Sequence, residues 1–252
     1  MERTRPAPLA TFFANEAPLE PKAQVSLGES VARHLRVRRL GAGTTIGLVD
    51  GAGRRATAML VREAKDSVTV EIADVEEVPT LPEVHLMVPV ADRDRMLWLA
   101  EKVAELGVTS WRPVLWRRSK SVSPRGEGPV FSAKVRGRMV GALEQSGGAH
   151  LPQIYPDAPL SRALNAVPAG GTRLVLDPAS PPVFGVPVQA PVTLALGPEG
   201  GLEDAEMTEL KNAGFLPVSL GPGILRFETA GAAGVAIARG LLHHHDGARH
   251  VG

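Results

Sequence analysis

Leu196-Gly197-Pro198-Glu199-Gly200-Gly201 and Leu220-Gly221-Pro222-Gly223-Ile224-Leu225-Arg226 are two glycine-rich turns in one stretch, residues 194–230. Each turn follows a short apolar run typical of a β-strand, residues 191–196 and 215–220, and each precedes a helix-like segment. The pattern predicts two adjacent strands whose ends place bare backbone at one edge of a sheet. Because ligands of open α/β folds bind at that edge, we expect the binding site there.

The composition excludes several kinds of site. The 252 residues include no cysteine, which excludes disulfides, cysteine-ligated zinc, iron–sulfur clusters and thiol nucleophiles. No stretch approaches the roughly 18 consecutive apolar residues that a membrane span requires. The first residues also lack the apolar run of a signal peptide. The sequence therefore predicts a cytoplasmic protein.

Charge is distributed unevenly along the chain, although the net charge is only +1. Residues 30–62 contain seven arginines and one aspartate, and residues 92–140 contain eleven basic and five acidic residues. From residue 141 onward, six basic residues face ten acidic ones. Two basic blocks beside an acidic one favour a polyanionic partner. Solvated surface arginines without such a partner are the alternative.

A domain boundary is predicted at Val78-Pro79-Thr80-Leu81-Pro82, where two prolines interrupt both helix and strand. Residues 1–78 contain three candidate strands (44–50, 55–61 and 67–72), and Asp50-Gly51 predicts a hairpin. Residues 29–40 predict a short helix with Val31, Leu35 and either Val37 or Leu40 facing inward. A small β-barrel with a basic helix at its rim fits this pattern.

Residues 79–252 alternate between candidate strands and helices. The candidate strands are residues 83–90, 108–116, 173–176 and 192–196. One candidate helix begins after Asp92, and three more span residues 130–145, 203–212 and 229–242. Such alternation predicts a mainly parallel sheet covered on both faces. The last helix is rich in alanine and glycine, which permits close approach of another backbone, inside the subunit or in a partner.

The two glycine turns match neither the dinucleotide-binding fingerprint nor the P-loop. They lie within a longer set of motifs: Leu196 to Gly201, Ala213-Gly214-Phe215, Val218 to Gly221, Ile224-Leu225-Arg226 and Glu228-Thr229-Ala230. This set resembles the C-terminal signature of the 16S ribosomal RNA uridine-N3 methyltransferases, members of the SPOUT class. Upstream matches include Glu101 to Val108, Arg117-Arg118-Ser119 and Glu144 to Gly147. His34-Leu35-Arg36-Val37 is similar to the family's PUA-like domain.

The resemblance implies an α/β fold, with a SPOUT trefoil-knot methyltransferase domain (79–252) preceded by a PUA-like β-barrel domain (1–78). It implies S-adenosylmethionine as the cofactor and direct methyl transfer to uridine N3. The implied cofactor-binding residues are Leu176, Asp177, Leu196, Gly197, Glu199, Gly201, Leu220, Gly221, Ile224 and Leu225. The implied partners are 16S ribosomal RNA in the small ribosomal subunit and a second copy of the chain.

Arg226 and Glu228 are the candidate catalytic residues, because uridine N3 becomes a nucleophile only when its proton leaves. The alternative is that this pair only caps the final helix. The candidate RNA-binding residues are His34, Arg36, Arg38, Arg39, Arg117, Arg118 and Lys120; a plain surface position is the alternative for His34. We predict no metal site at His243-His244-His245, because only Asp246 adds a nearby carboxylate.

The chain departs from the family pattern at Gly148 and Gly223, where the family usually has arginine, and at Phe227, where it usually has threonine. Two alternatives therefore stay open. One is a SPOUT enzyme acting on transfer RNA or another ribosomal position. The other is a non-catalytic RNA-binding or ribosome-assembly protein with the same fold.

Overall fold

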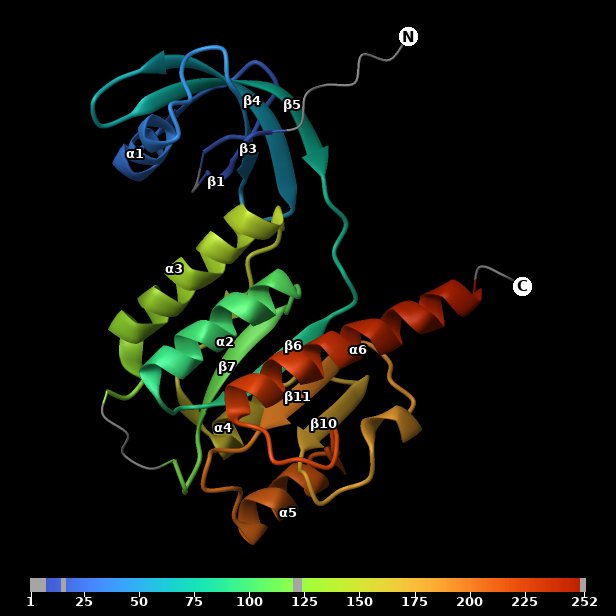
Figure 1. Cartoon of the computed structure of the whole chain (residues 1–252). Coiled ribbons are helices and arrows are strands. Elements are labelled where there is room, and N and C mark those ends of the chain that lie inside the picture. The colour runs from blue at the N-terminus through green and yellow to red at the C-terminus, as the bar shows by residue number, and fades with distance from the viewer. Residues whose placement is uncertain (1–7, 15–16, 120–123, 250–252) are drawn as a thin grey trace. The chain divides into compact units, whose positions relative to one another are not determined.

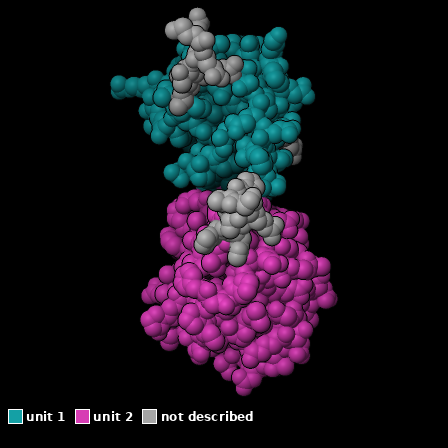
Figure 2. Space-filling view, turned by 90° about the vertical axis from the view of Figure 1, so that its right-hand side faces the viewer, with its two compact units in different colours: residues 1–80, 140–151 teal, residues 81–139, 152–252 magenta. Residues whose placement is uncertain are grey.

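The computed structural model describes residues 8–14, 17–119 and 124–249. The chain forms two compact units (Figure 2). The N-terminal unit consists of residues 1–80 and 140–151, and the C-terminal unit of residues 81–139 and 152–252. Each unit has its own sheet. Within the described part of the chain, no helix is long and apolar enough to cross a membrane.

The N-terminal unit is built on five strands in the order β1-β3-β4-β5-β2. Neighbouring strands are antiparallel except β1 and β3, which are parallel. The predicted hairpin is confirmed, since Asp50 Oδ1 accepts hydrogen bonds from the N–H groups of Ala52 and Arg54 at 2.8 and 2.9 Å. The elements are β1 (Thr11–Phe13), β2 (Gln24–Leu27), α1 (Glu29–Val37), β3 (Thr45–Val49), β4 (Arg54–Glu63) and β5 (Val68–Glu77).

Helix α1 is shorter than predicted. It ends at Val37, and Arg39 has a left-handed backbone with φ of 55°. Leu35 is buried in the core of the unit, whereas Val37 is 79% exposed. Of the two alternatives, Leu40 is therefore the residue that packs against the core.

Residues 140–151 complete the N-terminal unit, although they lie far along the chain. They contain the last turns of α3 (Gly128–Ser146). The N–H of Phe13 donates to Glu144 Oε1 at 2.9 Å, and the Arg55 guanidinium donates to the Gly147 carbonyl at 2.8 Å. The N–H of Gly53 donates to the Ala149 carbonyl at 2.9 Å. The β3–β4 hairpin is thus held by a segment about 90 residues later in sequence.

The C-terminal unit contains a parallel sheet in the order β12-β10-β11-β6-β7-β8, with β9 also paired to β7 (Figure 1). This confirms the predicted parallel sheet. The strands are β6 (Val84–Pro89), β7 (Ser110–Leu115), β8 (Gln153–Ile154), β9 (Ala158–Pro159), β10 (Thr172–Leu176), β11 (Val192–Leu196) and β12 (Leu216–Val218). The remaining helices are α2 (Arg93–Glu105), α4 (Leu160–Asn165), the 3-10 turn η1 (Val183–Gly185), α5 (Asp204–Asn212) and α6 (Phe227–Arg249).

Helices cover both faces of this sheet. Side chains of a strand alternate between faces, and those of Leu194 and Leu196 lie against α6, whereas Ala195 packs with residues of α4 and α5. A Cβ on Gly231 would lie 2.9 Å from methyl carbons of both Leu99 and Leu196. Glycine at this position therefore lets α6 pack between α2 and β11, so Gly231 serves a contact inside the subunit.

Three arginines cap the carboxyl ends of three helices in this unit. Each guanidinium donates to the carbonyl of a C-cap residue, which satisfies an unpaired backbone acceptor at the negative end of the helix dipole. Burial lowers the pKa of Arg239, but an arginine remains protonated in proteins. The pairs are Arg239 with Leu106 (α2, 3.1 Å), Arg112 with Ala166 (α4, 2.6 Å) and Arg173 with Ala213 (α5, 2.6 Å).

Arg239→Met is expected to lower the free energy of unfolding by about 2 kcal/mol, because buried carbonyls lose their charged donor. Arg239 is 8% exposed and also donates to the carbonyls of Pro82 and Gly107. Urea denaturation measures the change. Arg162→Met, which alters an exposed arginine of α4, is the control and should be nearly neutral. Equal stability of the two variants would contradict the capping role.

Candidate active site

The carboxyl ends of three parallel strands meet at one edge of the C-terminal sheet. The two glycine turns follow β11 and β12, as predicted, and lie at this edge. The two strands are not adjacent, however, because β10 lies between them. The prediction of neighbouring strands was wrong, since the order in sequence does not set the order in a parallel sheet. Asp177, at the end of β10, therefore lies in the middle of the site.

The first turn is a tight loop against the segment that follows β7. Gly201 has φ of 73°, and its N–H donates to the Pro198 carbonyl at 2.8 Å. A Cβ on Gly200 would lie 3.2 Å from Cβ of Arg118, which shows how closely the two loops approach. Glu203 follows as the N-cap of α5, in a capping box with Glu206. The turn is therefore held at both ends.

The second turn is more open. The N–H of Ser219 donates to the Pro181 carbonyl at 2.8 Å, and the N–H of Val183 donates to the Ser219 carbonyl at 3.0 Å, which fixes the start of the turn. Beyond it, a Cβ on Gly223 would meet no atom within 4 Å. Ile224 is 90% exposed and Leu225 is 43% exposed. An exposed apolar pair on an open loop offers a surface for a flat apolar ligand.

Several predicted cofactor residues direct their side chains toward α6 rather than toward the open edge. Methyl carbons of Leu176 and Leu220 would lie 3.2 and 3.9 Å from a Cβ on Gly234. Leu196 is 1% exposed beside Gly231. Leu196 can therefore offer a ligand only its backbone groups, whereas Leu176 and Leu220 are half-buried. Asp177 is half-buried, and its carboxylate accepts hydrogen bonds from the N–H of Ala179 and the hydroxyl of Ser180 at 3.1 and 2.6 Å.

Arg226 and Glu228 occupy different environments at the start of α6. Arg226 is exposed, and its carbonyl accepts the N–H of Ala230 at 2.8 Å, as the first helical hydrogen bond. Glu228 is 9% exposed, and its Oε2 is buried without a hydrogen-bond partner. An unpaired buried carboxylate oxygen is costly and rare in proteins. The acid also lies in the first turn of α6, where the helix dipole favours it.

Sequence reasoning missed Arg95 and Glu206. Arg95, in the first turn of α2, forms ion pairs with Glu199 of the first turn and with Glu228, at 3.9 Å in the latter case. Glu206 is 4% exposed and accepts the N–H of Arg117 at 2.8 Å. The capping box folds Glu206 inward. The spacing of apolar residues in the sequence does not indicate either residue, because the partners of both lie far away in the sequence.

The predicted RNA-binding residues fall into two groups. His34, Arg36, Arg38 and Arg39 are exposed on and after α1 in the N-terminal unit. His34 also packs edge-on against Phe12, with ring centroids 5.3 Å apart. In the C-terminal unit, Arg117 and Arg118 are exposed and lie 3.6 and 3.9 Å from the Glu203 carboxylate. Lys120 lies outside the described residues.

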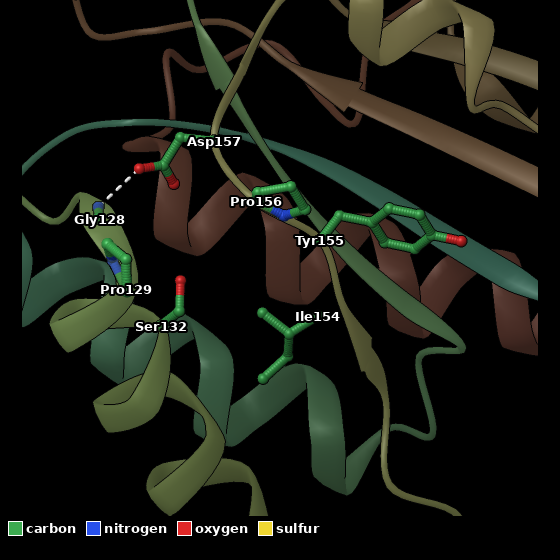
Figure 3. Close-up of a pocket in the computed structure, with 7 residues that line it drawn as sticks. All are labelled: Gly128, Pro129, Ser132, Ile154, Tyr155, Pro156 and Asp157. Atoms are coloured by element: carbon green, nitrogen blue, oxygen red, sulfur yellow. Dashed lines mark hydrogen bonds between the residues drawn. The ribbon is translucent and has the colours of Figure 1, made fainter.

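The C-terminal unit contains a pocket of about 460 Å³ (Figure 3). Its seven lining residues come from the start of α3 and from the β8–β9 segment, and Asp157 accepts the Gly128 N–H at 2.6 Å. The side chain of Tyr155 is directed away from Ser132 and Asp157 (Figure 3), and the Arg112 guanidinium lies 3.8 Å from its ring centroid. None of the predicted site residues lines this pocket.

A chain of contacts from Glu83 through His85 to Ser110 has the residue types of a hydrolase triad. His85 lies 3.3 Å from Glu83 and 2.8 Å from the Ser110 hydroxyl. Burial lowers the pKa of His85. Ser110 is only 1% exposed and also accepts a hydrogen bond from Arg112 at 3.0 Å. A substrate has no access to this hydroxyl, so the cluster is structural.

Metal ligation finds no support in the described side chains, among which no group of three histidines or acids could hold an ion. His243 is exposed. The side chains of His244, His245 and Asp246 lie outside the described residues.

Known proteins similar to this chain include ribosomal RNA small subunit methyltransferases E. The one from Mycobacterium tuberculosis is 27% identical over 90% of this chain and 92% of its own length. A crystal structure of the one from Neisseria gonorrhoeae, bound to S-adenosyl methionine, has a TM-score of 0.83 and 28% identity over 92% of this chain and 98% of that one. A methyltransferase from Legionella pneumophila in complex with the same cofactor has a TM-score of 0.82, with 28% identity over 92% and 97%.

Two family descriptions cover most of the sequence. Residues 27–73 match the RNA methyltransferase PUA domain, which agrees with the predicted PUA-like domain. Residues 78–239 match the RNA methyltransferase domain and include β6 to β12 with both glycine turns. The chain therefore belongs to the RNA methyltransferase domain family.

Proposed function

We propose that this protein transfers a methyl group from S-adenosylmethionine to N3 of a uridine in 16S ribosomal RNA of the small subunit. The observation that carries the proposal is the shared edge at which β10, β11 and β12 end in Asp177 and the two glycine turns. The similar ribosomal RNA small subunit methyltransferases E support it, as do the two similar structures that were solved with bound S-adenosyl methionine.

The residues at this edge fit the proposed cofactor. Glycine backbone at Gly197, Gly201 and Gly221 allows close approach to adenine and ribose, and Ile224 with Leu225 supplies an exposed apolar surface. Glu199 and Asp177 add polar groups, while Leu176, Leu196 and Leu220 contribute backbone N–H and C=O. When bound, S-adenosylmethionine supplies an electrophilic methyl group on a sulfonium.

The residues of α6 would prepare the nucleophile. As the new N–C bond forms and the C–S bond of the sulfonium breaks, the N3 proton of uridine must leave. Glu228, whose Oε2 is buried and has no hydrogen-bond partner, would accept it. Arg226, exposed one residue before the helix, would stabilise the negative charge that develops on the base. Because N3 lies on the Watson–Crick edge, the uridine must be unpaired when it reacts.

The basic residues would hold the surrounding RNA backbone. His34, Arg36, Arg38 and Arg39 present an exposed basic face, and Arg117, Arg118 and Lys120 form a second group. We further propose that the protein is cytoplasmic and forms a homodimer. Ala236 and Gly240 lie on a face of α6 that is exposed in the single chain, and small residues there would let a second copy pack closely. The domain limits 1–78 and 79–252 and the trefoil knot stay predictions.

The function is tested by incubating the purified protein with S-adenosylmethionine and either free 16S RNA or assembled small subunits. Nucleoside mass spectrometry is expected to detect N3-methyluridine, and calorimetry is expected to detect cofactor binding. A different methylated nucleoside would indicate another RNA target. No binding at millimolar S-adenosylmethionine would favour the non-catalytic alternative. The departures from the family pattern at Gly148 and Gly223 are the reason for considering that alternative. In cells, 16S RNA that keeps N3-methyluridine after deletion of the gene would contradict the proposed substrate.

A further inference from the structure

Arg95 connects three segments of the site that are far apart in sequence: the first turn of α2, the turn after β11 and the start of α6. Its own N–H donates to the Asp92 carboxylate at 3.0 Å, which fixes the residue in the first turn of α2. Its guanidinium then pairs with Glu199 in the turn after β11 and lies 3.9 Å from Glu228 Oε1 at the start of α6. The side chain is about one-third exposed, so it borders the site without being enclosed in the core.

The contact with Glu228 is one-sided. The Arg95 Nε faces Oε1, whereas Oε2 is buried and has no hydrogen-bond partner. A carboxylate that is only 9% exposed has lost most of its contact with water, and a nearby cation offsets part of that loss. The cation on one oxygen leaves the other oxygen free to accept a proton or a hydrogen bond.

We propose that Arg95 is a positioning residue, which holds Glu228 by its Oε1 and directs Oε2 toward the reacting base. The inference rests on the proposed function, in which Glu228 accepts the N3 proton. Glu199 keeps the guanidinium in place from the other side, so the first glycine turn, α2 and α6 are aligned by one cation. Arg95 itself touches no reacting atom.

The proposal predicts that Arg95→Met lowers kcat at least about tenfold and leaves the KM for S-adenosylmethionine within about twofold. Arg95→Lys, which keeps the charge, should recover most of the rate. In a double-mutant cycle, Arg95→Met should slow the Glu228→Gln variant no further, because the residue acts only through that carboxylate. Arg162→Met, an exposed arginine of α4 outside both basic blocks, is the control and should be unchanged.

The same cycle is measured by thermal unfolding, which does not depend on activity. Arg95→Met should lower the unfolding temperature by roughly 3 °C in the wild-type background. It should lower the unfolding temperature by less in the Glu228→Gln background, where the loss of Arg95 leaves no buried charge without its partner; the exposed Glu199 loses its partner in both backgrounds.

The two readouts separate the possible failures. If the wild-type protein methylates no RNA, the proposed function is contradicted. If the unfolding temperatures show no coupling between the two substitutions, the Arg95–Glu228 ion pair is contradicted. With an active wild type, independent rate losses in the double variant, or full activity of Arg95→Met, would overturn the positioning role while leaving the methyltransferase assignment intact.

Discussion

Glu228→Gln is expected to lower kcat by about 100-fold while leaving cofactor affinity within about twofold. Glutamine has nearly the same shape as glutamate, so the packing of this 9% exposed side chain should survive. The amide cannot take the N3 proton, however, and that loss falls on the chemical step. Initial rates with saturating RNA and S-adenosylmethionine, together with calorimetry of cofactor binding, measure both quantities.

The matched control for this variant is Glu209→Gln, which neutralises a partly exposed acid on α5 and should keep the full rate. Arg226→Ala extends the test to the second, exposed candidate residue, and a loss of kcat is expected there too. If both Glu228→Gln and Arg226→Ala retain nearly wild-type activity, the two residues serve only to start α6, and the catalytic assignment is removed.

Gly171→Ala is expected to lower the free energy of unfolding by about 4 kcal/mol, the largest stability effect that we predict. Gly171 precedes β10 with φ of 66°, and a Cβ there would overlap the carbonyl oxygen of Pro191. That carbonyl accepts the N–H of Thr172 at 3.0 Å and belongs to the entry of β11. Differential scanning calorimetry should show a loss of roughly 10 °C.

Gly170→Ala provides the comparison within the same loop. Gly170 has φ of 76°, but a Cβ there would meet no atom within 4 Å. Only backbone strain should therefore destabilise Gly170→Ala. We expect the free energy of unfolding to fall by about 1 kcal/mol and the unfolding temperature by roughly 3 °C. Equal losses in the two variants would show that the overlap with Pro191 relaxes freely, and would contradict the prediction.

Local sequence patterns predicted the elements well where periodicity and turn residues agree. The predicted helix of residues 130–145 is present as α3, and its apolar residues Phe131, Val135, Met139 and Leu143 are all buried. The Asp50-Gly51 hairpin and the parallel sheet are confirmed as well. These features depend on residues close together in sequence, so the pattern of apolar side chains and glycines is sufficient to indicate them.

Contacts between distant segments were not predictable in the same way. Residues 140–151 join the N-terminal unit through Glu144, Gly147 and Ala149, although nothing in their local pattern distinguishes them from the rest of the second half of the chain. Arg239 is one basic residue in a long helix until the fold places the end of α2 beside it. Such pairs form only when distant segments of the chain pack together, so local sequence patterns do not indicate them.

The stretch from residue 194 to 230 shows the same division. Its glycine turns, the strands before them and the helix after them were determined by sequence alone, because glycine, proline and apolar runs restrict the backbone locally. Tertiary structure decided that β10 separates the two turns, that Leu196 and Leu220 face α6, and that Arg95 meets Glu228. The reason is physical: the order of parallel strands and the partner of a buried charge depend on how the whole sheet and its helices pack.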